Sequence, residues 1–133
     1  MRTLVATLLF IALQALATPL TAADQGWIQS VPHAISAEGI YKVRILEIDG
    51  AEQGDLIRYP LEAGRHTVRL RLLLAVEWEP DLAEAPRGPG WKELEVVVEP
   101  GKRYVLAARV DLEAPIESQL DQSYWEPFIF RVD

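Results

Sequence analysis

Apolar and polar residues alternate along most of the chain after residue 38, and a period of two is typical of half-buried β-strands. The alternation predicts strands at 39–50, 56–60, 66–74, 92–98, 104–112 and 124–133. No segment after residue 23 has the apolar period of a convincing amphipathic helix, and 113–123 is expected to be a loop. Many short strands without helices predict an all-β protein, specifically an immunoglobulin- or fibronectin-III-like antiparallel β-sandwich.

Segments 66–74 and 92–98 are predicted to be antiparallel neighbours, because one register places apolar residues together on one face and opposite charges together on the other. The predicted partners are Leu70 with Leu94, Val68 with Val96, Arg69 with Glu95 and Arg71 with Glu93. A slip of one residue would turn the charged side chains inward, so the two faces select this pairing.

Glycine and proline mark the turns between these segments. Pro60 has no backbone N–H, so we expect 56–60 at the edge of a sheet or at the end of a strand. Gly64 can adopt the positive φ that a tight turn requires. His66 follows it, in phase with the apolar face of the next strand. The ring is either a ligand or proton-transfer group beside the turn, or a packing residue that bonds a turn carbonyl; the second interpretation is favoured.

The stretch VEPGKRY, residues 98–104, resembles the tyrosine corner of fibronectin type III and related immunoglobulin-like domains. The positions that match are Val98, Pro100, Gly101 and Tyr104. The resemblance implies that the chain crosses between sheets here and that the Tyr104 hydroxyl bonds nearby backbone. A simple hairpin over 99–103 is the alternative that the Pro-Gly pair leaves open.

Four further stretches, ILEIDG, LEAGRHTVRL, PGKRYVL and WEPFI, occur in an order that is similar to a loose set of bacterial envelope proteins, the PEGA-type and curli-inhibitor-like (DUF2057-like) domains. The resemblance implies a periplasmic β-sandwich. Ala63 departs from it, because proline is common at that place in such turns. The chain also has no cysteine for the lipid anchor that many envelope proteins use.

The N-terminus has the layout of a cleaved signal peptide. Arg2 precedes an apolar run from Leu4 to Leu16, and small residues follow up to Ala23. The run is shorter than a membrane-spanning helix needs, so we expect cleavage after Ala23 and export to the periplasm or beyond. Residues 24–133 then form one domain, with no membrane span. Without cysteine it has no disulfide, and its stability must come from burial.

Charge and composition exclude several classes of function. The chain carries 13 basic and 20 acidic residues, a formal net charge of −7, which argues against nucleic acid and anionic lipid as partners. Its two histidines, His33 and His66, have no neighbours at metal-ligand spacing, so no metal or cofactor is expected. No GxSxG motif is present, which disfavours a serine hydrolase. We therefore expect no enzyme.

The region 77–91 holds the candidate binding residues. Three acidic residues and one tryptophan lie at its start, and a second tryptophan lies at its end. The candidates are Glu77, Trp78, Glu79, Asp81 and Trp91. The favoured interpretation is a non-enzymatic module that binds a periplasmic or cell-envelope protein through this loop or through edge strands. The alternative is a carbohydrate-binding module, in which Trp78 and Trp91 stack on peptidoglycan or polysaccharide and carboxylates bond the hydroxyls. A third interpretation gives the loop no binding function: its acidic side chains are only solvated, and its indoles are buried in the core.

Overall fold

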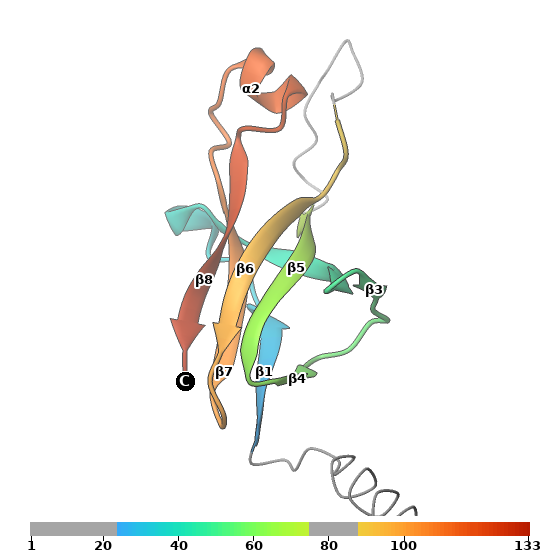
Figure 1. The fold of residues 1–133 in the computed structure, drawn as a ribbon. Helices are drawn as coiled ribbons and strands as arrows, with labels where there is room; N and C mark the ends of the chain where they lie inside the picture. Colours follow the sequence, from blue (N-terminus) through green and yellow to red (C-terminus); the bar gives the residue numbers. More distant parts are fainter. Residues whose placement is uncertain (1–23, 75–87) are drawn as a thin grey trace, which may run out of the picture.

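The computed structural model describes residues 24–74 and 88–133, and within them the all-β class is confirmed (Figure 1). The strands are β1 (Gln25–Ser30), β2 (Ile40–Ile48), β3 (Ala51–Glu52), β4 (Tyr59–Glu62), β5 (Gly64–Leu73), β6 (Lys92–Val98), β7 (Arg103–Val110) and β8 (Trp125–Val132). Two short helices accompany them, the 3₁₀ helix η2 (Ser36–Glu38) and α2 (Ile116–Leu120).

The strands form a continuous sheet with the order β4-β1-β7-β2-β5-β6, in which β8 also pairs with β7 and β3 with β2. β1 runs parallel to β7, and the other pairs are antiparallel. The sheet curls, so that β5 and β6 lie across from β7 and β8 (Figure 1). One buried apolar cluster draws residues from every strand except β3 and fills the space enclosed by the curl.

β2 is the strand that carries the sheet around this curl. Its first residues, Ile40 and Tyr41, pair with β7. From Lys42 to Ile48 it pairs with β5 instead, with an irregularity at Leu46. The irregularity lies within the part of β2 that pairs with β5, where a bulge increases the local twist and bends the strand.

β7 is buried on both faces. Leu106 and Ala108 point into the main cluster, whereas Val105 and Ala107 lie in a smaller cluster on the other face. The rings of Phe128 and Phe130, from β8, partly cover that smaller cluster and meet edge to face. Apolar contacts on both sides make β7 the centre of the fold.

The predicted pairing of β5 with β6 is correct, but its register is wrong by two residues. Val68 lies opposite Leu94, and Arg69 lies opposite Glu93. A shift of two keeps every side chain on its predicted face, so the alternation cannot distinguish the two registers. The observed one lets the Arg69 guanidinium reach both Glu93, at 3.1 Å, and Glu47 of β2, at 2.9 Å.

The chain between β6 and β7 forms a corner and not a hairpin, since no ladder joins these two strands within the described residues. Gly101, with φ of 76°, completes a turn in which Lys102 N–H donates to Glu99 O. The bond implied by the tyrosine-corner resemblance is present: Glu99 N–H donates to the Tyr104 hydroxyl at 2.9 Å. β1 lies against this corner, where a Cβ on Gly26 would come within 3 Å of two carbonyl oxygens.

Three local predictions are corrected. Residues 113–123 contain the helix α2, which is too short to produce a detectable helical period. The strand expected at 56–60 begins only at Tyr59, and it is the edge strand β4, with Pro60 inside it. No strand was predicted before residue 39, yet β1 lies between β4 and β7.

Replacing Tyr104 by Phe should lower the free energy of unfolding by about 1–3 kcal/mol, because the half-buried Glu99 N–H loses its acceptor. Urea denaturation followed by tryptophan fluorescence measures this change. Tyr41→Phe is the matched control: both side chains are 5% exposed, and the Tyr41 hydroxyl makes no hydrogen bond within the described residues. An equal loss of unfolding free energy in the two variants would show that the hydrogen bond of the Tyr104 hydroxyl does not stabilise the corner.

Candidate functional site

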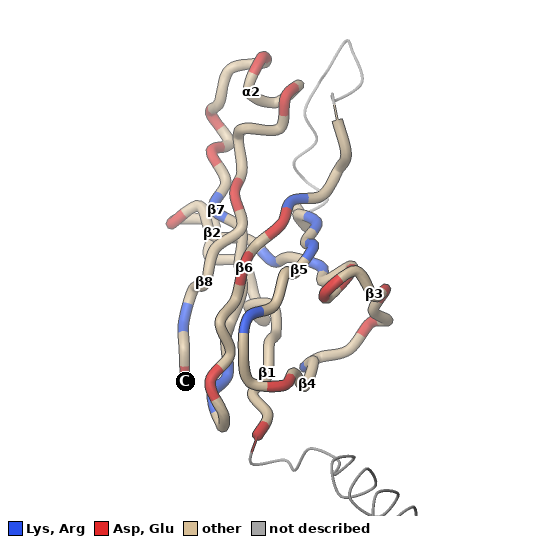
Figure 2. The backbone as a smooth tube through the Cα atoms, viewed as in Figure 1, with Lys and Arg blue, Asp and Glu red and all other residues tan. Residues whose placement is uncertain are grey.

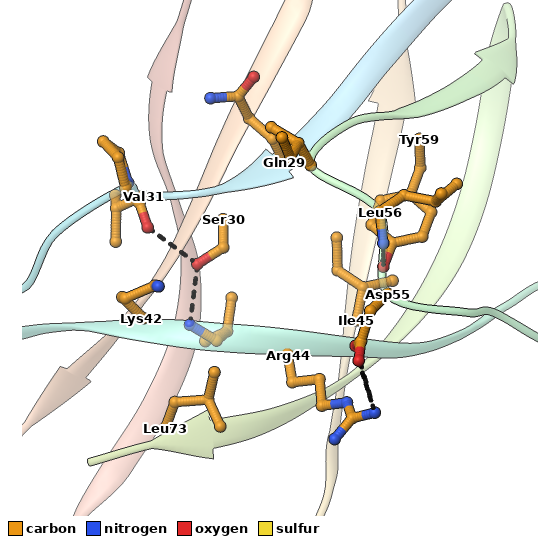
Figure 3. Close-up of a pocket in the computed structure, with 13 residues that line it drawn as sticks. Gln29, Ser30, Val31, Lys42, Arg44, Ile45, Asp55, Leu56, Tyr59 and Leu73 are labelled. Carbon is orange, nitrogen blue, oxygen red and sulfur yellow. Dashed lines mark hydrogen bonds and ion pairs between the residues drawn. The ribbon is translucent and has the colours of Figure 1, made fainter. Parts of the chain in front are cut away.

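A groove opens where β1 and β2 separate, with a volume of about 450 Å³ (Figure 3). Both strands pair with the same edge of β7, β1 along 103–106 and the start of β2 along 108–109. β2 then turns away toward β5, and the gap that results is the groove, which we call the β2 groove. It is lined by Gln29, Ser30, Val31, Pro32, Lys42, Val43, Arg44, Ile45, Asp55, Leu56, Ile57, Tyr59 and Leu73.

One wall of the β2 groove is an unpaired strand edge. On the side away from β5, no strand in the described part of the chain pairs with β2 between residues 42 and 46. Val43 N–H points to that side, where it donates to the Ser30 hydroxyl at 3.0 Å (Figure 3). Because alternate residues of a strand direct their backbone groups to the same edge, Ile45 directs its N–H and C=O there too. The groove therefore offers backbone donors and acceptors.

The opposite wall is the loop before β4, which presents exposed apolar side chains. Leu56 is 59% exposed and Ile57 88% exposed. The Tyr59 hydroxyl fixes this loop, since it donates to Gly54 O at 2.6 Å and accepts from Leu56 N–H at 3.1 Å. An ion pair of 3.2 Å between Arg44 and Asp55 spans from β2 to the loop (Figure 3). These contacts fix the conformation of the loop in which Leu56 and Ile57 are exposed to solvent.

His66 lies outside the β2 groove and has the surroundings of a packing residue. Its Nδ1 is 2.6 Å from an Asp49 carboxylate oxygen, and its Nε2 is 2.7 Å from the backbone oxygen of Glu62. Both partners accept hydrogen bonds, so the doubly protonated imidazolium satisfies both. The ring joins the turn after β2 to the turn at Gly64, whose φ is 126°. Both ring nitrogens are thus engaged with groups of the protein itself.

The pKa values of this pair are shifted in opposite directions. Burial lowers the pKa of His66, but its hydrogen bonds to Asp49 and Glu62 outweigh burial and raise that pKa above 6.5. The pKa of Asp49 falls below 3.8, first because its carboxylate accepts the Thr67 N–H at 2.9 Å and then because of His66. Each group favours the charged form of the other.

Of the predicted loop residues, only Trp91 lies within the described part of the chain; Glu77, Trp78, Glu79 and Asp81 lie outside it. The Trp91 ring stacks on the Arg69 guanidinium, 3.9 Å from ring centroid to carbon. A cavity of about 320 Å³ adjoins them, and its other lining residues are Leu46, Glu47, Glu52 and Gln53. Within the described residues, the polar groups beside Trp91 come from β2, from β3 and the residue after it, and from Arg69 of β5.

The β2 groove itself was missed by sequence reasoning. Its only detectable signal is the adjacent apolar pair Leu56 and Ile57, which was assigned to a strand. Within residues 24–74 and 88–133, no cluster of three or more possible metal ligands occurs. The same ranges contain no helix with the length and hydropathy needed to cross a membrane.

The ionic pair predicts a specific pH dependence of stability. Because the folded-state pKa of His66 is raised, its contribution is complete below pH 6.5 and disappears as the pH rises through the folded-state value. Asp49, with a lowered pKa, contributes above pH 3.8 and loses its contribution as the pH falls through its folded-state value. His66→Gln should therefore destabilise the protein more at about pH 5.5 than at about pH 9.

Urea unfolding of wild type and His66→Gln at both pH values checks this. His33→Gln is the control, because His33 is exposed and makes no hydrogen bond or ion pair in the described residues. A difference between wild type and His66→Gln that is the same at both pH values would mean that the ring acts only by packing.

No protein-family model, curated protein or solved structure matches the chain. The resemblances to PEGA-type and curli-inhibitor-like domains therefore stay predictions.

Proposed function

We propose that this protein is an exported, non-enzymatic binding module, an immunoglobulin-like β-sandwich that takes an extended segment of a partner protein into the β2 groove. The partner belongs to the periplasm or cell envelope. One observation carries the proposal: an unpaired edge of β2 lies beside two exposed apolar side chains held in place by Tyr59.

An open strand edge is a template for another strand. In β-augmentation, main-chain hydrogen bonds provide affinity, and pockets for alternate side chains provide specificity. Unpaired edges also promote aggregation, and proteins commonly cover or interrupt them. Here the Ser30 hydroxyl accepts the Val43 N–H without closing the groove, so one donor of the edge is satisfied in the free protein while the rest of the edge stays accessible to a partner.

Export is supported by the first 23 residues alone. A basic residue, an apolar run and then small residues are the parts of a secretory leader. Cleavage near Ala23 would leave β1 close to the new N-terminus. A domain that reaches the envelope without cysteine depends on its apolar core, and the cluster shared by seven strands suits that requirement.

A second candidate function is glycan binding at Trp91. An indole bordered by carboxylates, an amide and a guanidinium has the composition of a sugar subsite, in which the ring stacks on the sugar and polar groups bond hydroxyls. The neighbours that favour it are Glu47, Glu52, Gln53 and Arg69. Against it, Arg69 already stacks on the ring.

Ile57→Asp should weaken partner binding at least about tenfold, because it places a charge where the partner's apolar side chains would lie. Photocrosslinking from position 57, in the cells that make the protein, identifies the contacted segment. That segment is then synthesised and titrated against the purified chain. Ile116→Asp is the matched control, since Ile116 is 62% exposed but lies in α2, outside the groove. Equal affinity for wild type and Ile57→Asp would refute binding in the groove.

Soluble peptidoglycan fragments should leave the tryptophan fluorescence of the protein unchanged, and Trp91→Phe should retain affinity for the captured protein segment. Fluorescence titration of wild type and Trp91→Phe tests both statements. A saturable change that is lost in Trp91→Phe would favour the glycan function over the protein-binding one.

A further inference from the structure

The β2 groove is bordered by positive charge in a chain that is acidic overall. Lys42 and Arg44 line it from β2, and Arg71 faces Arg44 from β5. Arg58 lies next to Ile57 and is also exposed. Figure 2 shows Lys and Arg positions gathered on β2 and on the adjoining end of β5. We call Lys42, Arg44 and Arg71 the basic patch.

The described contacts of the basic patch contribute little to the stability of the fold. Arg44 and Arg71 are direct cross-strand partners, and like charges in that position are destabilising. Lys42 and Arg71 make no ion pair with any described residue. Arg44 has one, with Asp55, in which both side chains are largely exposed.

The rest of β5 neutralises its cations. Arg65 pairs with Glu95 at 2.6 Å, and Arg69 pairs with Glu93 and Glu47. Among the described residues of β2 and β5, the cations without an ion pair are Lys42 and Arg71, both at the end of the sheet beside the groove. The described contacts give no folding reason for this difference within one strand, whereas a negatively charged ligand would account for it.

We infer that the segment bound in the β2 groove is acidic, an extended polypeptide in which acidic and apolar side chains alternate. The inference rests on the proposed function. A strand added to the β2 edge would direct every second side chain to the face that carries Lys42 and Arg44. The intervening side chains would point toward Leu56 and Ile57 on the opposite wall.

The net charge of −7 makes this attraction local. An acidic ligand is repelled by the protein as a whole and attracted by the basic patch, so salt screening acts on both. At physiological ionic strength the nearby charges dominate, because the screening length is about 8 Å. Charge complementarity of this kind selects among possible partners more than it adds affinity.

Three short labelled peptides test the inference by fluorescence anisotropy with the purified full chain. One alternates Glu with Val, the second replaces Glu by Gln, and the third replaces Glu by Lys. The Glu peptide should bind at least about tenfold more tightly than the Gln peptide, and the Lys peptide should bind most weakly.

Charge reversal at the basic patch supplies the matching variants. Lys42→Glu with Arg71→Glu should reverse the preference, so that the Lys peptide binds more tightly than the Glu peptide. Lys102→Glu with Arg131→Glu changes the net charge equally at positions outside the groove, and should keep the wild-type order.

The outcomes separate the inference from the proposed function. Equal binding of the Glu and Gln peptides, both weakened by Ile57→Asp, would remove the acidic preference and leave the groove as a peptide site. Binding of the Glu peptide that is unaffected by Ile57→Asp and by reversal of the basic patch would place the peptide elsewhere and remove both. Failure of all three peptides to bind would also remove both.

Discussion

The change of partner within β2 is the constraint on which the rest of the structure depends. The strand leaves β7 after Tyr41 and joins β5, and the bend brings the two halves of the sheet around one core. The same bend separates β2 from β1, although both strands pair with the same edge of β7. A strand that turns away from its neighbour exposes its own edge. The fold therefore produces the groove as a direct consequence of the way it closes its core.

Polar contacts at the ends of the strands hold this arrangement without any disulfide. Tyr104 fixes the corner between β6 and β7, and Tyr59 fixes the loop before β4 by the same device, a phenol that bonds backbone a few residues away. His66 and Asp49 join two turns through an ion pair. Each of the two side chains also bonds the backbone, His66 at Glu62 O and Asp49 at the Thr67 N–H. Each contact fixes the position of a segment that has little apolar surface of its own.

The sequence was informative wherever a property repeats along a strand. Alternation located β2, β5, β6, β7 and β8, and it identified the buried face of β5 and β6, but β7 is buried on both faces. It could not fix the register of β5 on β6, because shifts of two residues preserve both faces. It also missed β1, whose six residues hold only two buried positions and whose place depends on a parallel partner far along the chain.

The candidate site was less predictable, for a related reason. Its lining comes from β1, β2, the loop before β4 and the end of β5, segments that only the bend in β2 brings together. Trp91 lies beside a polar cavity whose other residues include Glu47 and Glu52, which are brought together by the pairing of β2 with β3. Such neighbours follow from tertiary structure and have no signature in the local pattern.

The parallel pairing of β1 with β7 also sets the order in which the chain can fold. Trp27 pairs with Arg103, so the first strand finds its place only after three quarters of the chain has become available. Pairings over such sequence separations form slowly, since the intervening loop must first be closed. During synthesis β1 can pair with β4 once residue 62 is available, but its other edge stays unpaired until β7 has been made. The sheet therefore cannot close around its core until most of the chain is available.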